Sequence, residues 1–250
     1  MKHGNRHRRA GYIGYAALCL IGAMLLSPSV PGAAEPPSFA DVLAGMKAKL
    51  AATKDYRCRL VTQSSNGDET REVVLHYFYQ RPDRIRMEVL EGPYSGSLLI
   101  YDGEQQAQKV RVLAGNRLVA FLQRMIYGEY FAVDHKWVVD LRGNGIHESH
   151  WPHFIRTHEA YLRRGTTRFV REEILDGRTA YVFRLVSDIP EKTMTVKTED
   201  LWVDAESLFP VQYFQYDDSG RLMRKAIVTE LRFNTGISER LFKEFHPDMD

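Results

Sequence analysis

Two spacings of apolar residues alternate along this chain and predict its elements. After Ser38, a preferred helix N-cap, the residues Val42, Leu43 and Met46 fall on one stripe of a helix that reaches about Lys54. Beyond it the period changes to two, as in β-strands. The predicted strands are Tyr56–Gln63, Arg71–Gln80, Arg84–Glu91, Ser97–Asp102 and Gln105–Val112, with tight turns at Asn66-Gly67 and Asp102-Gly103.

A second group of strands follows a helical middle region. Helical spacing predicts helices over Asn116–Tyr127 and Ser149–Arg164. The period of two then returns. It predicts strands at Thr167–Leu175, Thr179–Val186, Met194–Asp204, Pro210–Tyr216 and Arg221–Phe233. About ten strands joined mostly by short turns favour one antiparallel sheet, and a sheet of that size must curl.

Several of these strands are apolar on both faces. In the second strand, Val73, Leu75 and Tyr77 share one side, and Val74 and Phe78 share the other. A sheet with one solvated face would instead alternate apolar and polar residues. We therefore expect the first helix and the helical middle region to cover the concave face. The pattern leaves open whether the covered space is filled or forms a cavity.

The N-terminus has the three parts of a secretory signal peptide. A basic head is followed by an apolar run from about Tyr12 to Leu26 and by Gly32-Ala33-Ala34. We expect cleavage after Ala34, residues 1–34 as the signal peptide, residues 35–250 as one domain, and the periplasm as the destination. The run is shorter than the roughly 20 residues of a membrane span. An uncleaved anchor is the alternative.

Removal of this segment changes the charge and the cysteine count. It takes four of the 34 basic side chains and none of the 32 acidic ones, which leaves a slightly acidic chain. That balance gives no electrostatic footprint for nucleic acid. Cys58 is then the only cysteine, so it can form no internal disulfide. Because it alternates with Tyr56 and Leu60, we expect a small buried apolar residue.

Short motifs occur in an informative order. They are Arg81-Pro82 between two strands; Leu99-Ile100-Tyr101-Asp102-Gly103; Leu201-Trp202-Val203-Asp204 followed by Pro210-Val211; and an end with Asn234, Phe242-Lys243-Glu244-Phe245 and Pro247. Their order and spacing resemble the LolA-like lipid and lipoprotein carriers of the bacterial envelope. The resemblance covers nearly all of residues 35–250, and within the family the DUF1571 group is most similar.

This resemblance implies an unclosed half β-barrel, mainly β, whose helices form a lid over an apolar cavity. Such proteins carry or sense acyl chains. The resemblance, together with the strands that are apolar on both faces, suggests which residues form the cavity wall. They are Tyr77, Tyr79, Ile85, Met87, Leu98 and Ile100 from the strands and Leu118, Leu122 and Met125 from the lid. Arg81 stands at the family's arginine before a proline, which holds the lid closed through helix carbonyls. The alternative is a solvated arginine at a strand end.

The segment 130–164 departs from the family pattern and holds His147, His150, His153 and His158. Two of them three residues apart, together with Glu148, could bind zinc. The stronger H-E-x-x-H spacing is absent, however, so we predict no metal site. The chain also lacks a nucleophile elbow, a P-loop and a dinucleotide motif. We therefore predict no catalytic residue and no cofactor.

Three functions remain in view. The preferred one is a monomeric periplasmic carrier or chaperone whose partners are the acyl chain of a lipid or lipoprotein and envelope proteins of the inner and outer membranes. The second is a sensor or interaction module that uses the same cavity. The third is a metal-dependent hydrolase that uses the segment His147 to His158.

Overall fold

The computed structural model describes residues 35–190 and 195–246. The predicted signal peptide, Met194 and Pro247 lie outside the described residues. The elements up to the middle of the chain are α1 (Phe39–Ala52), β1 (Asp55–Ser65), β2 (Thr70–Gln80), β3 (Arg84–Glu91), β4 (Leu98–Asp102), α2 (Gly103–Gln106), β5 (Lys109–Leu113), α3 (Arg117–Ile126), β6 (Tyr130–Ala132), η1 (Ile146–Glu148) and α4 (Trp151–Arg163). They are followed by β7 (Gly165–Leu175), β8 (Arg178–Ser187), β9 (Thr198–Asp204), β10 (Pro210–Tyr216), β11 (Leu222–Phe233) and η3 (Glu239–Phe242).

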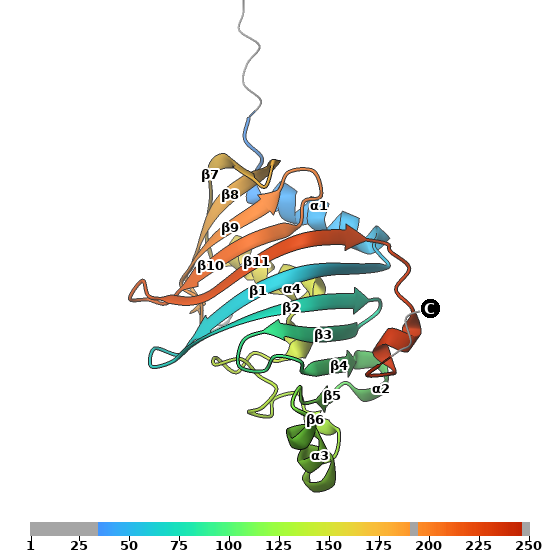
Figure 1. Ribbon diagram of the computed structural model, residues 1–250. Helices are drawn as coiled ribbons and strands as arrows, with labels where there is room; N and C mark the ends of the chain where they lie inside the picture. Colours follow the sequence, from blue (N-terminus) through green and yellow to red (C-terminus); the bar gives the residue numbers. More distant parts are fainter. Residues whose placement is uncertain (1–34, 191–194, 247–250) are drawn as a thin grey trace, which may run out of the picture. The chain divides into compact units, whose positions relative to one another are not determined.

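One antiparallel sheet contains the described strands. Its order is β6-β5-β4-β3-β2-β1-β11-β10-β9-β8-β7, with 11 strands and two free edges. The two halves meet in the middle, where β1 pairs with β11 from Tyr56 opposite Phe233 to Ser64 opposite Arg224. Figure 1 shows the sheet curling around the helices. The mainly β fold with one unclosed antiparallel sheet covered by helices is therefore confirmed.

Two helices pack on the concave face of the sheet (Figure 1). Helix α1 begins after Ser38, whose side chain accepts a hydrogen bond from the Asp41 backbone N–H at 3.1 Å. Its apolar stripe, including Val42 and Met46, is buried, as is Ile155 of α4. Side chains of α1, α4 and the strands form one continuous apolar core. Burial of these stripes against the sheet supplies the main stabilisation of both helices.

Helix α3 lies beyond β6 at the edge of the sheet (Figure 1). Asn116 caps it by accepting hydrogen bonds from the backbone N–H groups of Leu118 and Val119. Ala120 and Gln123 are its buried residues, and Nε2 of Gln123 donates to the Val112 carbonyl at 2.7 Å. Within the described residues, no helix is both long enough and apolar enough to cross a membrane.

The C-terminal segment packs on the convex face of β2 to β5. Arg86 of β3 is only 3% exposed, and its guanidinium donates to the backbone carbonyls of Leu241, Glu244 and Phe245. Ile100 packs there in one cluster with Phe242 and Phe245. This cover explains why several strands are apolar on both faces, since the convex side also meets protein.

The main differences from the predicted elements are two strands that begin later and one strand that was not predicted. The strand expected over Gln105–Val112 begins later, because Asp102 caps the short helix α2 by accepting from the N–H groups of Glu104 and Gln105. The strand expected over Met194–Asp204 is observed over Thr198–Asp204. The edge strand β6 was not predicted, since its three residues are too few for a period of two to register.

Candidate functional site

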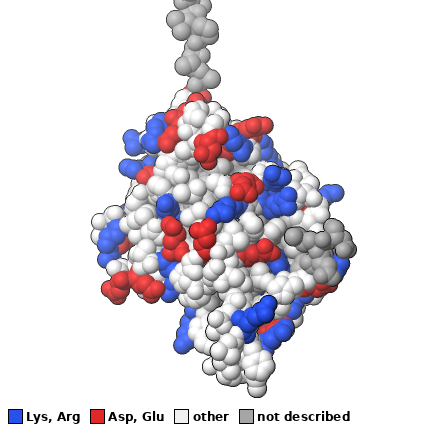
Figure 2. Space-filling view, viewed as in Figure 1, with Lys and Arg blue, Asp and Glu red and all other residues white. Residues whose placement is uncertain are grey.

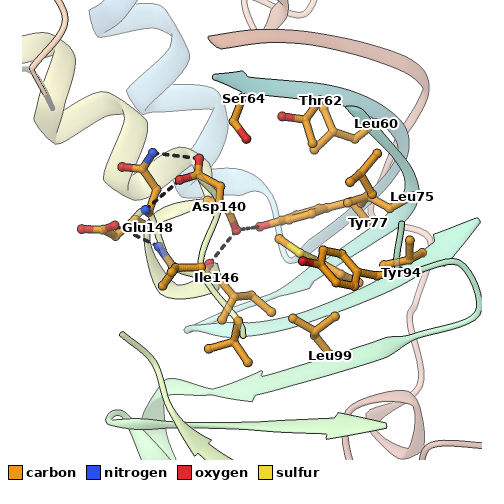
Figure 3. Close-up of a pocket in the computed structure, with 18 of the residues that line it drawn as sticks. Leu60, Thr62, Ser64, Leu75, Tyr77, Tyr94, Leu99, Asp140, Ile146 and Glu148 are labelled. Carbon is orange, nitrogen blue, oxygen red and sulfur yellow. Dashed lines mark hydrogen bonds between the residues drawn. The ribbon is translucent and has the colours of Figure 1, made fainter. Parts of the chain in front are cut away.

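A cavity of about 630 Å³ lies between the concave face of the sheet and the segments that cover it. Its size is that of typical small-molecule sites. The strands supply an apolar floor, which includes Leu60, Leu75, Tyr77, Met87, Val89, Leu99 and Val112. Figure 3 shows Leu60, Leu75 and Tyr77 on neighbouring strands, with Leu99 further along the same surface. A floor of this kind favours a hydrocarbon over a polar ligand.

The other walls come from helices and from the loop that follows β6. Val119, Leu122 and Ile126 of α3 line one side of the cavity, and Trp151 and Phe154 of α4 line another. Trp151 stacks on the ring of Tyr56 at a centroid distance of 3.9 Å and on Phe209 at 4.1 Å. This stack anchors the start of α4 on the sheet, and it therefore fixes the position of one cavity wall.

Polar side chains gather at the part of the cavity bordered by β10, β11 and the loop before η1. Arg224, Gln215, His153 and Asp140 all line it. In Figure 3, Asp140 and Glu148 lie across the cavity from the strands that carry Leu75 and Tyr77. The Asp140 carboxylate accepts hydrogen bonds from the N–H groups of Arg142 and Asn144 and from Nδ2 of Asn144. The site thus combines an apolar floor with one polar region.

The structure places the nine nominated wall residues in four environments. Tyr77, Met87 and Leu122 line the cavity. Tyr79 and Ile85 lie in the main apolar core, outside the cavity lining. Leu98 and Ile100 pack against the C-terminal segment on the convex face. Leu118 and Met125 are 66% and 69% exposed on the outer side of α3.

The placement of Leu98 and Ile100 has a simple geometric reason. Strand β4 pairs with β3 so that Leu99 stands opposite the cavity residue Met87, and Ile100 stands opposite Arg86. Successive residues of a strand point to opposite faces. Leu99 therefore faces the cavity and its two neighbours face away, which the pattern of three consecutive apolar residues could not reveal.

Arg81 is exposed, and it connects the end of β2 to a helix. Its Nη1 donates to the Ala51 carbonyl, at the C-terminal end of α1, at 2.6 Å. Unpaired carbonyls at a helix end are natural acceptors for a guanidinium. The contact is thus with α1, and α3 lies at a different edge of the sheet (Figure 1).

The four histidines of the middle region have separate surroundings. His150 caps α4 by accepting at Nδ1 from the His153 N–H, and its Nε2 lies 3.2 Å from Oδ1 of Asp83. His158 is buried with Nε2 2.8 Å from Glu199, whose other oxygen accepts from Gln215. Within the described residues, no group of three or more His, Cys, Asp and Glu side chains is placed to hold a metal ion.

Cys58 lines the cavity floor between Tyr56 and Leu60. It is a free thiol, and burial raises its pKa to about 12. A thiol in that environment stays protonated at neutral pH and is a poor nucleophile. Its place in the cavity agrees with the small apolar residue expected from the strand pattern.

Other cavity residues were not nominated from the sequence. Leu60, Leu75 and Leu99 could have been found from strand parity, because each shares a face with a nominated residue. Residues of the loop between β6 and α4, including Val138 and Ile146, carry no periodic signal. Arg224 carries no signal for a cavity residue either, since a charged residue within a strand is normally expected to face solvent.

Comparisons with known proteins give similar folds at low identity. No family model matches the chain, and no curated protein matches it. An uncharacterized conserved protein from Thermus thermophilus is 12% identical with a TM-score of 0.48, and the match covers 84% of this chain and 94% of that one. In the MucA/MucB complex of Pseudomonas aeruginosa, the matched chain is 15% identical with a TM-score of 0.46, and 82% of this chain matches 61% of it. A LolA superfamily protein from Nitrosomonas europaea is 10% identical with a TM-score of 0.36, and coverage is 84% and 99%.

Proposed function

We propose that this protein is a periplasmic carrier that binds the acyl chain of a lipid or lipoprotein in the cavity under α3 and α4. The observation that carries the proposal is the cavity itself, with about 630 Å³ of space over a floor of apolar strand residues. Interiors are normally close-packed, so a large apolar cavity calls for an occupant. An acyl chain matches its chemistry.

The energy of such binding suits a carrier. Each buried methylene contributes about 0.8 kcal/mol, so ten of them contribute about 8 kcal/mol before the costs of association. Those costs are several kcal/mol and leave a modest net affinity. A carrier needs that balance, because it must release its cargo to an acceptor as well as accept it from a donor.

Within this proposal, Arg81 holds helix α1, one of the two helices that cover the concave face of the sheet, and does not contact the ligand. Its hydrogen bond to Ala51 joins the end of β2 to α1, which packs beside α4. Helix α3, with its outer face exposed, is the wall that can move when a chain enters. Export to the periplasm is proposed from the signal-peptide pattern of residues 1–34.

The direct test is uptake of a fluorescent fatty acid by the purified domain, together with mass spectrometry of lipid extracted after gentle isolation. Leu60→Trp fills the cavity floor and should weaken uptake strongly. Val61→Trp is the matched control, because the next residue of the strand points to the opposite face. Absence of saturable uptake by the wild type, with no co-purified lipid, would sink the proposal.

A second candidate is a sensor or interaction module of the same fold. It is favoured by the exposed apolar side chains of α3, among them Phe121 at 59% and Met125 at 69% exposure. Figure 2 shows that the tip of the molecule where α3 lies is mostly uncharged. A partner protein captured by the wild type and lost in Phe121→Ser, with uptake unchanged, would favour this function.

A further inference from the structure

Arg224 occupies an unusual position for an arginine. It lies near the start of β11, where it pairs with Ser64 of β1 and with Gln215 of β10. All three residues line the cavity. The arginine is therefore on the concave face of the sheet, in the same space as the apolar floor.

The guanidinium of Arg224 is not fully satisfied. Its Nε is buried and has no hydrogen-bond partner among the residues that the structure describes. Its guanidinium carbon lies 5.7 Å from the centroid of the Tyr213 ring, a contact that stabilises a cation but satisfies no N–H group. Arg224 as a whole is half-buried, but a buried N–H group normally has an acceptor, because a donor left unpaired away from water is costly.

A second unsatisfied group lies in the same lining. Nε2 of His153 is buried and likewise has no hydrogen-bond partner within the described part of the chain. Burial lowers the pKa of His153, and the cations Arg156, His147 and Arg224 lower it further, against an opposing effect of Glu148. A neutral imidazole still has one N–H to donate.

Two cationic groups, Arg142 and Arg224, also meet here, and the charge of Asp140 favours the charged form of both. Burial lowers the pKa of Arg142, and the charge of Arg224 lowers it further, which means that the two guanidinium groups repel each other. Arg142 donates to Oγ1 of Thr195 at 2.9 Å. An anion bound between such groups would relieve the repulsion.

The nearby carboxylates have other donors. Asp140 accepts three hydrogen bonds from Arg142 and Asn144. Glu148 accepts from the Gly145 N–H, and Glu199 accepts from Gln215 and lies 2.8 Å from His158. Their charges offset part of the positive potential. Two lining atoms have no partner within the described residues: Nε of Arg224, which can only donate, and Nε2 of His153, which donates in one of its two neutral tautomers. An acceptor on the ligand satisfies both.

We propose that Arg224 and His153 form a subsite for the oxyanion of an amphiphile, a carboxylate or a phosphate, whose acyl chain lies on the apolar floor. The inference rests on the proposed function and names the chemical class of its ligand. Arg224 binds the oxyanion through parallel N–H donors, the geometry in which a guanidinium is strongest. The chain then runs over Leu75 and Met87 toward α3.

The test compares ligands that share one chain and differ at the head. Dodecanoate, dodecyl phosphate and dodecanol compete with a fluorescent fatty acid for the wild type. We expect both anions to bind about tenfold more tightly than the alcohol, as charge-assisted hydrogen bonds predict. Which anion binds more tightly then separates a fatty acid from a phosphorylated lipid as the source.

Variants test whether Arg224 causes the preference for anions over the alcohol. Arg224→Met should remove the preference and leave dodecanol affinity unchanged, and Arg224→Lys should retain part of it. Arg71→Met is the matched control, because Arg71 lines the same cavity but already donates to Tyr94 and Glu69 at 2.7 Å. Circular dichroism and thermal unfolding verify that each variant folds, and the wild-type comparison needs no variant.

The outcomes separate this inference from the function on which it rests. Equal binding of alcohol and anions by the wild type overturns the subsite and leaves the acyl cavity standing. A preference that persists in folded Arg224→Met also overturns it. If no acyl chain binds to the wild type, the carrier function fails. The anion subsite would then still stand if the wild type binds inorganic phosphate and Arg224→Met does not. If the wild type does not bind phosphate either, the subsite fails together with the carrier function.

Discussion

Helices α4 and α3 both border the cavity, but they are held in different ways. Helix α4 packs into the main core, with Trp151 stacked between two rings and Ile155 only 4% exposed. Helix α3 is held by polar contacts of Gln123 with the Val112 carbonyl and of Arg124 with Glu129, and it exposes most of its large apolar side chains. The contrast indicates that one wall belongs to the folded core, while the other can open at little cost in stability.

The largest expected difference is in folding. Trp151→Ala should destabilise the protein by about 3–5 kcal/mol, the usual cost of deleting a buried aromatic side chain. Phe121→Ala on α3 should stay within about 0.5 kcal/mol, since its ring is 59% exposed. Urea unfolding followed by circular dichroism measures both values. Similar losses in the two variants would break the contrast between the helices.

The second difference is in the response to acid. Burial and the nearby cations Arg156, His153 and His147 lower the pKa of His150 to about 4, from 6.5. The unfolded chain therefore binds the proton first, and stability present above pH 6.5 is lost as the pH falls toward 4. The loss is at most on the order of 3 kcal/mol, because the Asp83 carboxylate lies 3.2 Å from Nε2 and favours the protonated ring.

Unfolding free energies measured across that pH range test this expectation. His150→Asn keeps a side chain that can cap α4 and removes the titration, so its stability should depend less on pH. His76→Asn, which replaces an exposed histidine of β2, should keep the wild-type slope. A wild-type stability that stays constant over this range would contradict the role of His150.

The third difference is in ligand binding by two residues of α3. Leu122 lines the cavity, whereas Met125 points outward. Leu122→Asp should weaken fatty-acid binding by about tenfold, because it replaces the apolar contact of a side chain that is 46% exposed by a charge. Met125→Asp should bind as the wild type does. Titration with a fluorescent fatty acid measures both, and equal losses would mean that α3 acts as a whole and not through its inner face.

The smallest effect concerns the helix that Arg81 holds. Arg81→Leu removes one exposed hydrogen bond to α1 and should cost about 1 kcal/mol or less in stability. We expect a larger relative change in the rate of ligand release, measured by stopped-flow fluorescence. Arg57→Leu, on the exposed side of β1, is the control. Identical release by wild type and Arg81→Leu would remove the role proposed for this residue.

The fold could be predicted because its signals are local. Alternating residues in β2 and β3, Ser38 before α1 and Asn116 before α3 each mark an element within a few positions. The short strand β6 and the loop before η1 carry no such period, so they were missed. Their conformation depends on contacts with residues distant in the chain.

The cavity could be predicted only in part, because it depends on which face of each strand is covered by which segment. Tyr77 and Met87 were found from strand parity. Leu98 and Ile100 were nominated because nothing in the local pattern reveals that the C-terminal segment covers the convex face. Arg86 and Arg224 illustrate the same point, because the sequence pattern does not distinguish these two arginines of the sheet. Arg86 binds carbonyls of the C-terminal segment, whereas Arg224 faces the cavity.

The pairing of β1 with β11 has a consequence for how the chain folds. These strands join the two halves of the sheet, yet they stand near opposite ends of the domain, with Tyr56 opposite Phe233. Contacts so distant in sequence form slowly, since a long loop must close before they contribute. Until residues 222–233 arrive, β1 presents an unpaired edge that invites pairing with other chains. Products truncated before Leu222 should therefore aggregate instead of yielding a smaller folded domain.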